Sequence, residues 1–145
     1  MKIENIIENW KEDCKINKDI LDRESMDIAV LHNKYYIFLM EERLTLKKYE
    51  QEYNKLRLDK WEYYNGSISE EKLTERNWEP CQLKILKSES NMYIDADDDI
   101  INMRNKIDFQ KEKVEYVTAI VDRINHRGFQ IKNAIDFIKY LNAQV

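Results

Sequence analysis

A heptad repeat of apolar residues in the last third of the chain constrains the fold more than any other feature of the sequence. Between Ile100 and Ile138 the apolar positions are spaced alternately by three and four residues, and only Gln110 and Gly128 interrupt them. Such a repeat is typical of a helix that packs along a partner helix. The spacing therefore predicts one long helix over about residues 97–142.

Gly128 is the one position at which this helix could be divided. It falls on the apolar seam, and the register of the repeat is the same on both sides of it. In a continuous helix the glycine costs about 1 kcal/mol relative to alanine, and it allows close approach of a neighbour. The alternative is that the glycine separates two helices.

The composition of the chain favours an all-α fold. Its 145 residues include only two glycines and one proline, too few turn formers for a sheet with its connections. Apolar residues at helical spacing predict a second long helix over about 26–64, and short helices over 2–13 and 69–77. We expect residues 1–94 to form an N-terminal helical module with a DNA-binding face, and 95–145 a coiled-coil-like oligomerisation helix.

Several classes of protein lack support in the sequence. No run of 18 apolar residues suggests a membrane span, and the acidic N-terminus is unlike a signal peptide, so we expect a soluble cytoplasmic protein with no membrane partner. No phosphate loop, GxSxG, HExxH or CxxC motif occurs. We therefore expect no enzyme activity, no catalytic residues and no cofactor.

Four aspartates lie between residues 95 and 99, but their pattern does not match a calcium-binding loop. Counted from Asp95, an EF-hand needs glycine at the sixth position and glutamate at the twelfth, where this chain has Ile100 and Lys106. Acidic residues at a helix N-terminus are favoured by the helix dipole. We expect this structural role and no metal site.

Positive charge is concentrated in two segments of an otherwise acidic chain. Residues 43–64 carry 6 basic and 4 acidic side chains, and residues 102–145 carry 8 and 5, although the formal net charge is −4. Within the first segment Arg57, Lys60, Trp61 and Tyr64 follow the i, i+3, i+4, i+7 spacing of one helix face. Cations interleaved with aromatic rings are suited to phosphates and unstacked bases.

This pattern predicts a DNA-binding site, with a structural alternative. Arg57 and Lys60 are the expected phosphate contacts, because their neighbours on that helix face are not acidic. The alternative is a solvated helix face whose aromatic rings enter the core, and Trp61 could serve either purpose. The cations expected to extend the site on preceding turns are Lys47, Lys48 and Lys55.

The C-terminal seam offers more apolar positions than a short second helix could cover, so we expect it to hold an oligomer together. The expected interface residues are Val114, Val117, Val121, Ile124, Gly128, Ile131 and Ile135.

Two motifs resemble the UvsY family of phage recombination mediators. The first is Arg127-Gly128-Phe129, followed by Ile131-Lys132 and Asp136. The second is the basic stretch 55–60 before Tyr63-Tyr64-Asn65-Gly66. The family's basic stretch can place cations two residues apart, whereas here Arg57 and Lys60 bracket Leu58 and Asp59.

The resemblance implies a ring of six or seven subunits that binds single-stranded DNA. Such a ring loads a RecA-like recombinase onto strands covered by single-strand-binding protein, and it would act in the host cytoplasm if the chain is phage-encoded. The alternative is a coiled-coil scaffold or adaptor that binds only protein. The basic and aromatic residues at 57–64 favour the mediator, because a scaffold does not need them.

Overall fold

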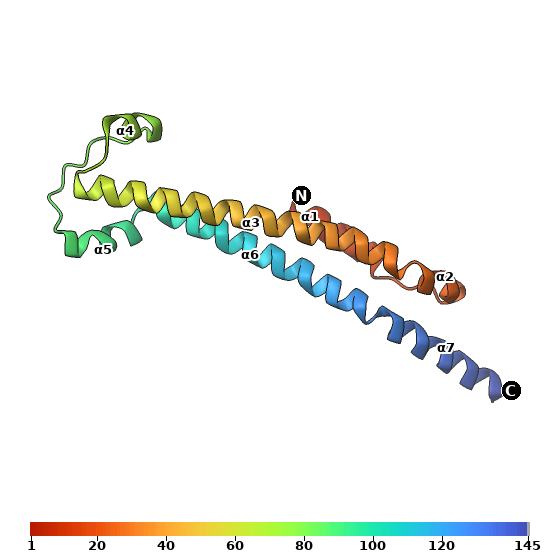
Figure 1. Cartoon of the computed structure of the whole chain (residues 1–145). Helices are drawn as coiled ribbons and strands as arrows, with labels where there is room; N and C mark the ends of the chain where they lie inside the picture. The colour runs from red at the N-terminus through yellow and green to blue at the C-terminus, as the bar shows by residue number, and fades with distance from the viewer. Residues whose placement is uncertain (145) are drawn as a thin grey trace. The chain divides into compact units, whose positions relative to one another are not determined.

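The computed structural model describes residues 1–144 and confirms the all-α fold (Figure 1). Val145, the last residue of the predicted oligomerisation segment, lies outside the described residues. Within residues 1–144 no strand is present, and every helix is too short or too polar to span a bilayer. The helices are α1 (Ile3–Asp13), η1 (Lys18–Ile20), α2 (Leu21–Met26), α3 (Ile28–Asn65), α4 (Glu70–Arg76), η2 (Lys87–Glu89), α5 (Ser90–Asp95), α6 (Asp98–Asn125) and α7 (Arg127–Ala143).

The chain forms two compact units, and both long helices α3 and α6 contribute to each of them. Unit 1 contains Met1–Leu44 and the segment that begins at Lys111, and unit 2 contains Thr45–Gln110. The predicted boundary at residue 94 is a different kind of division, because it separates a DNA-binding module from an oligomerisation helix. It stays a prediction about function.

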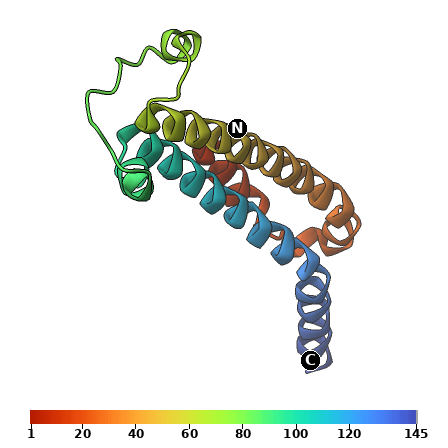
Figure 2. The ribbon, with the colours of Figure 1, turned by 60° about the vertical axis from the view of Figure 1, so that its left-hand side comes forward.

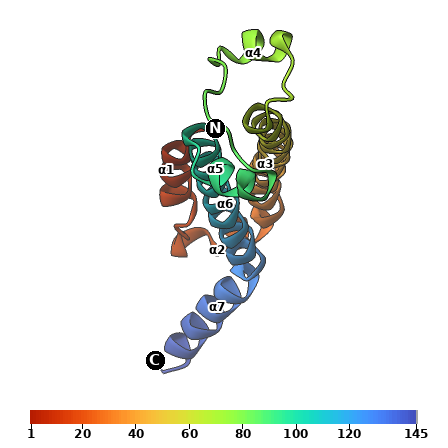
Figure 3. The ribbon, with the colours of Figure 1, turned by 90° about the vertical axis from the view of Figure 1, so that its left-hand side faces the viewer.

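The core of unit 1 is built where α1 packs on α3 and α6 (Figures 1 and 3). Ile6, Tyr35, Val117 and Ile124 are completely buried there. The ring of Tyr35 meets Trp10 edge-on at 5.4 Å, and its hydroxyl donates to Asp13 Oδ2 at 2.9 Å. Burial and this hydrogen bond raise the pKa of Tyr35 far above its usual value. The heptad seam from 114 to 124 therefore has its partner helices within the same chain.

The predicted C-terminal helix is present but bent at His126, two residues before Gly128. The His126 N–H bonds to the carbonyl of Arg123, and its ring nitrogen Nδ1 lies 2.8 Å from the carbonyl of Asp122. The side chain thus takes the acceptor that its own backbone would use in an α-helix, which interrupts the helical ladder. Figure 2 shows α7 turned away from the direction of α6.

Arg127 fixes the start of α7 against the end of α1. Its guanidinium donates to the backbone carbonyls of Asp13 and Lys15, both at 3.0 Å, and pairs with Glu24 at 3.0 Å. Its side chain is only 6% exposed. A cation that binds the last carbonyls of a helix satisfies groups that have no partner within the helix.

Gly128 has a looser environment than the sequence suggests. A Cβ atom built at this position would meet only Ile28 Cδ1, at an ordinary contact distance of 4.0 Å. Within the described chain, Gly128 is therefore not required for a close approach between helices.

Short helices and turns shape unit 2 around the end of α3 (Figure 2). Gly66 ends α3 with a positive φ of 74°, and the Ser69 hydroxyl caps α4 by accepting from the N–H of Lys72. Residues 77–86 are irregular, as Pro80 suggests. The next short helices, η2 and α5, follow this irregular segment and lead to the start of α6.

Two valines of unit 1 provide a matched test of the intrachain core. We expect Val117→Ala to lower the free energy of unfolding by about 2 kcal/mol, because its side chain is fully buried. Val30→Ala is the control, since Val30 is 71% exposed. Urea denaturation followed by circular dichroism measures the free energy of unfolding of both variants. An equal decrease in the two variants would contradict the assignment of Val117 to the core.

Candidate nucleic-acid interface

The end of α3 has two faces with different electrostatic surroundings. The inner face carries Tyr53, Arg57, Lys60 and Tyr64, which contact residues of α5 and of the start of α6. The outer face lies on the opposite side of α3, and we define it as the exposed residues Lys47, Lys48, Gln51, Asn54, Lys55, Leu58 and Trp61.

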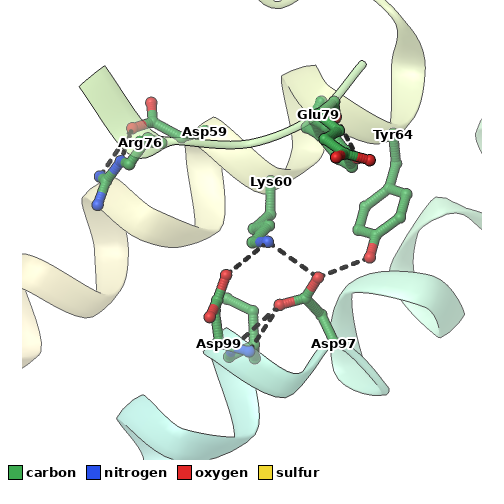
Figure 4. A network of polar contacts seen from close by, with 9 residues as sticks. Asp59, Lys60, Tyr64, Arg76, Glu79, Asp97 and Asp99 are labelled. Carbon is green, nitrogen blue, oxygen red and sulfur yellow. Dashed lines mark hydrogen bonds and ion pairs between the residues drawn. The ribbon is translucent and has the colours of Figure 1, made fainter. Parts of the chain in front are cut away.

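Lys60 is the centre of a buried network on the inner face (Figure 4). Its ammonium lies 3.0 Å from Asp97 and 2.9 Å from Asp99, and 4.0 Å from the centroid of the Trp78 ring. The lysine side chain is 6% exposed and that of Asp97 is 8% exposed. A buried cation is stable only when opposite charge and hydrogen bonds replace its water.

Asp97 connects this network to the first turn of α6. Its Oδ2 accepts from the Tyr64 hydroxyl at 2.6 Å, and its Oδ1 accepts from the backbone N–H of Asp99 at 2.9 Å. The second contact caps α6, which agrees with the structural role expected for the acidic run. Burial alone raises the pKa of Asp97, but hydrogen bonds from Tyr64 and Lys60 outweigh it and hold the pKa below the usual value.

A second ion-pair group covers the side of α3 that faces α4. Arg76 donates through Nε and Nη2 to Asp59 Oδ2 at 3.0 and 2.7 Å. Lys72 lies 3.3 Å from Asp59 and 2.9 Å from Glu62. These contacts lower the pKa of Asp59 although burial opposes the shift. Asp59 and Glu62 of α3 are therefore both paired with cations of α4.

The chain matches the family described as "recombination, repair and ssDNA binding protein UvsY" over residues 9–144. It belongs to the UvsY family. The recombination protein uvsY of Enterobacteria phage T4 is 24% identical to it over 139 residues, which cover 94% of each chain.

Crystal structures of the bacteriophage T4 recombination mediator UvsY have the same fold. One matches with a TM-score of 0.82 at 19% identity, covering 97% of this chain and 99% of the T4 chain. A second lattice type matches with a TM-score of 0.78 at 20% identity, covering 98% of each chain. The predicted UvsY resemblance is therefore confirmed in sequence and in fold.

The structure separates the predicted DNA-binding residues of this UvsY-family chain. Lys47, Lys48, Lys55 and Trp61 lie exposed on the outer face, and the Trp61 side chain is 44% exposed. Arg57, Lys60 and Tyr64 lie on the inner face instead. On their own helix face Arg57 and Lys60 have no acidic neighbours, but Asp95, Asp97 and Asp99 reach them from outside α3.

Most of the residues expected at the oligomer interface are buried within the single chain. Val117, Val121 and Ile124 are buried in the intrachain core, Val114 packs against it, and Ile131 is 2% exposed. Ile135 is partly buried and Gly128 is exposed. The apolar side chains that α7 leaves exposed are Phe129, Phe137, Ile138, Tyr140 and Leu141.

Arg104 is a site residue that sequence reasoning missed. It lies on α6 yet shares both Asp95 and the Tyr53 hydroxyl with Arg57. The net positive charge of residues 102–145 indicated that cations of this segment could bind DNA. Only the packing of α6 beside α3 within unit 2, however, brings Arg104 to Arg57.

The lowered pKa of Asp97 predicts an acid-sensitive stability. A carboxyl with a depressed pKa stabilises the fold above its unfolded pKa and loses this contribution as the pH falls through the folded pKa. The free energy of unfolding should therefore decrease below about pH 4. We expect Asp97→Asn to be less stable than wild type at pH 7 and to lose less on acidification.

Urea denaturation at pH 7, 4 and 3 measures this difference. Asp98→Asn is the control, because Asp98 is exposed one residue away and should keep the acid dependence of the wild type. The same loss on acidification in Asp97→Asn and in wild type would contradict the role of Asp97.

Proposed function

We propose that this protein is a recombination mediator that binds single-stranded DNA through the outer face of α3. It acts as a ring of six or seven subunits and promotes loading of a RecA-like recombinase onto strands covered by single-strand-binding protein. The observation that carries this proposal is the match to the UvsY family over residues 9–144. The T4 relative is named a recombination mediator.

The outer face supports the DNA-binding part of the proposal. Its three lysines make no ion pair within residues 1–144, whereas Lys60 is enclosed by carboxylates. At 3.6 residues per turn, Lys47, Lys48, Lys55 and Trp61 fall within roughly 140° of the helix circumference. Exposed lysines can neutralise phosphates, and the exposed indole of Trp61 can stack on a base.

The inner face is better suited to holding unit 2 together than to binding DNA through Lys60. A phosphate would have to replace two carboxylates around an almost fully buried ammonium. Removing one partner of a buried ion pair typically costs about 3–5 kcal/mol. We therefore assign Lys60 and Tyr64 a structural role and give the phosphate contacts to Lys47, Lys48 and Lys55.

The exposed face of α7 supports the oligomeric part of the proposal. Phe129, Phe137, Tyr140 and Leu141 lie on one stripe of the helix and are between 48% and 69% exposed. The rings of Phe137 and Tyr140 are stacked with their centroids 6.4 Å apart. Exposed large apolar side chains gathered on one side of a helix are typical of a protein interface. We propose that this stripe contacts a second copy of the chain.

The DNA-binding proposal predicts the effect of removing the outer lysines. Lys47→Ala, Lys48→Ala and Lys55→Ala combined should weaken binding of oligo(dT) and flatten the salt dependence by about 0.7 in log–log slope for each lost phosphate contact. Fluorescence anisotropy over a series of salt concentrations measures both quantities. The fold should not change, because the three side chains are exposed.

A triple variant of equal charge provides the control. Lys11→Ala, Lys15→Ala and Lys18→Ala remove three exposed cations from the N-terminal region. If both triple variants bind alike, net charge alone explains the affinity and the outer face is not the site. A protein that binds no oligo(dT) would favour the scaffold function.

The oligomer proposal predicts that charge on α7 dissociates the assembly. Phe137→Glu with Leu141→Glu should reduce the mass measured by sedimentation equilibrium without changing the helical content, since both side chains are exposed in the single chain. Lys132→Glu and Lys139→Glu, at exposed positions of the same helix, provide the comparison for added negative charge. An unchanged mass in the Phe137→Glu, Leu141→Glu variant would exclude this interface.

A further inference from the structure

Two arginines from different helices meet at one carboxylate beside the inner face of α3. Arg57 Nη1 donates to Asp95 Oδ1 at 3.1 Å, and Arg104 Nη2 donates to the same oxygen at 2.7 Å. Both guanidiniums also donate to the Tyr53 hydroxyl oxygen, Arg57 at 3.4 Å and Arg104 at 3.3 Å. The four side chains form a cluster with a formal charge of +1.

This cluster differs from the Lys60 network in its exposure to solvent. The side chains of Arg57, Arg104 and Asp95 are 35%, 41% and 50% exposed, whereas that of Lys60 is 6% exposed. Exposed ion pairs contribute little to stability, because water competes for both partners. Half-exposed side chains also change rotamer rapidly. Asp95 can therefore leave the arginines at low cost, whereas Asp97, the buried partner of Lys60, cannot leave its lysine in this way.

We propose that Arg57, Arg104 and Tyr53 form a phosphate-binding site for the backbone of single-stranded DNA, and that Asp95 occupies this site in the free protein. The inference rests on the proposed DNA-binding function and adds to it a second contact region with an internal competitor. DNA binding then exchanges the Asp95 carboxylate for a phosphodiester of the same charge.

The chemistry of the cluster fits a phosphodiester. Guanidinium groups bind the two non-bridging phosphate oxygens with paired N–H donors. The contacts of Arg57 within residues 1–144 use Nη1, and those of Arg104 use Nε and Nη2, so further N–H donors remain on both. Tyr53 accepts from both arginines and keeps its hydroxyl hydrogen for an acceptor. Burial alone raises the pKa of Tyr53, and the two arginines more than reverse this shift.

The test removes the competitor and then one of the arginines. Asp95→Asn keeps the size of the side chain but not its charge, so oligo(dT) should bind several-fold more tightly at low salt, with a salt slope steeper by about 0.7. Arg104→Gln should weaken binding, and adding it to Asp95→Asn should abolish the gain. Asp98→Asn is the matched control, because it removes the same charge from an exposed residue three positions away.

The outcomes separate this inference from the proposed function. A gain in Asp95→Asn that exceeds the gain in Asp98→Asn and disappears with Arg104→Gln supports the phosphate site. Equal affinities of the two aspartate variants, with wild-type protein binding oligo(dT), overturn the site and leave the proposed function standing. If the wild-type protein does not bind oligo(dT), the proposed function fails and the site fails with it.

A measurement on the wild-type chain covers the case in which a variant does not fold. Phenylglyoxal modifies accessible arginines, and mass spectrometry locates the modified residues. We expect oligo(dT) to protect Arg57 and Arg104 while exposed Arg123 stays reactive. Unchanged modification of Arg57 and Arg104 at saturating oligo(dT) would overturn the inference.

Discussion

The buried contact between Lys60 and Asp97 determines how unit 2 is organised. Asp97 caps α6 through its backbone contacts and binds Lys60 and Tyr64 of α3 through its other oxygen. Trp78, from the irregular segment after α4, covers the same ammonium. The pair of Lys60 and Asp97 thus connects the end of one long helix, the start of the other and the chain between them. A cation in this position adds little to net stability unless all of these contacts form together.

The same contact decides which cations of α3 remain available to a ligand. The buried Lys60 is paired with two carboxylates, and Asp59 and Glu62 form ion pairs with α4. What remains on the outer face is positive charge beside the exposed Trp61. An acidic chain can present a basic surface in this way, because local and not total charge governs the attraction of phosphates at physiological salt.

In the proposed assembly, unit 1 provides the contact between copies of the chain. Its core uses the seam between 114 and 124 inside the chain, and Arg127 holds α7 to the end of α1. The exposed apolar stripe of α7 takes no part in this core, so it remains available for the proposed contact between copies. In the proposed assembly, several outer faces would bind one strand far more tightly than a single face, so a few lysines per chain would suffice.

The sequence alone determined the helical class and most helix positions. The low glycine and proline content excluded a sheet, and the spacing of apolar residues located α1, α3 and the long C-terminal segment, because helical periodicity is a local property. The structural role of the acidic run before α6 was also readable, since it depends on neighbours along the chain. The UvsY motifs gave the family, which the comparisons confirm.

Tertiary structure decided the partners of these elements. Arg57, Lys60, Trp61 and Tyr64 share one helical pattern in sequence, yet Asp95, Asp97 and Asp99 engage the inner residues and leave Trp61 exposed. Heptad spacing showed that the seam requires a partner, but it could not show that α1 and α3 of the same chain provide it. Periodicity fixes which residues share a face of a helix. Which groups meet that face depends on contacts between residues far apart in sequence, and these exist only in the folded chain.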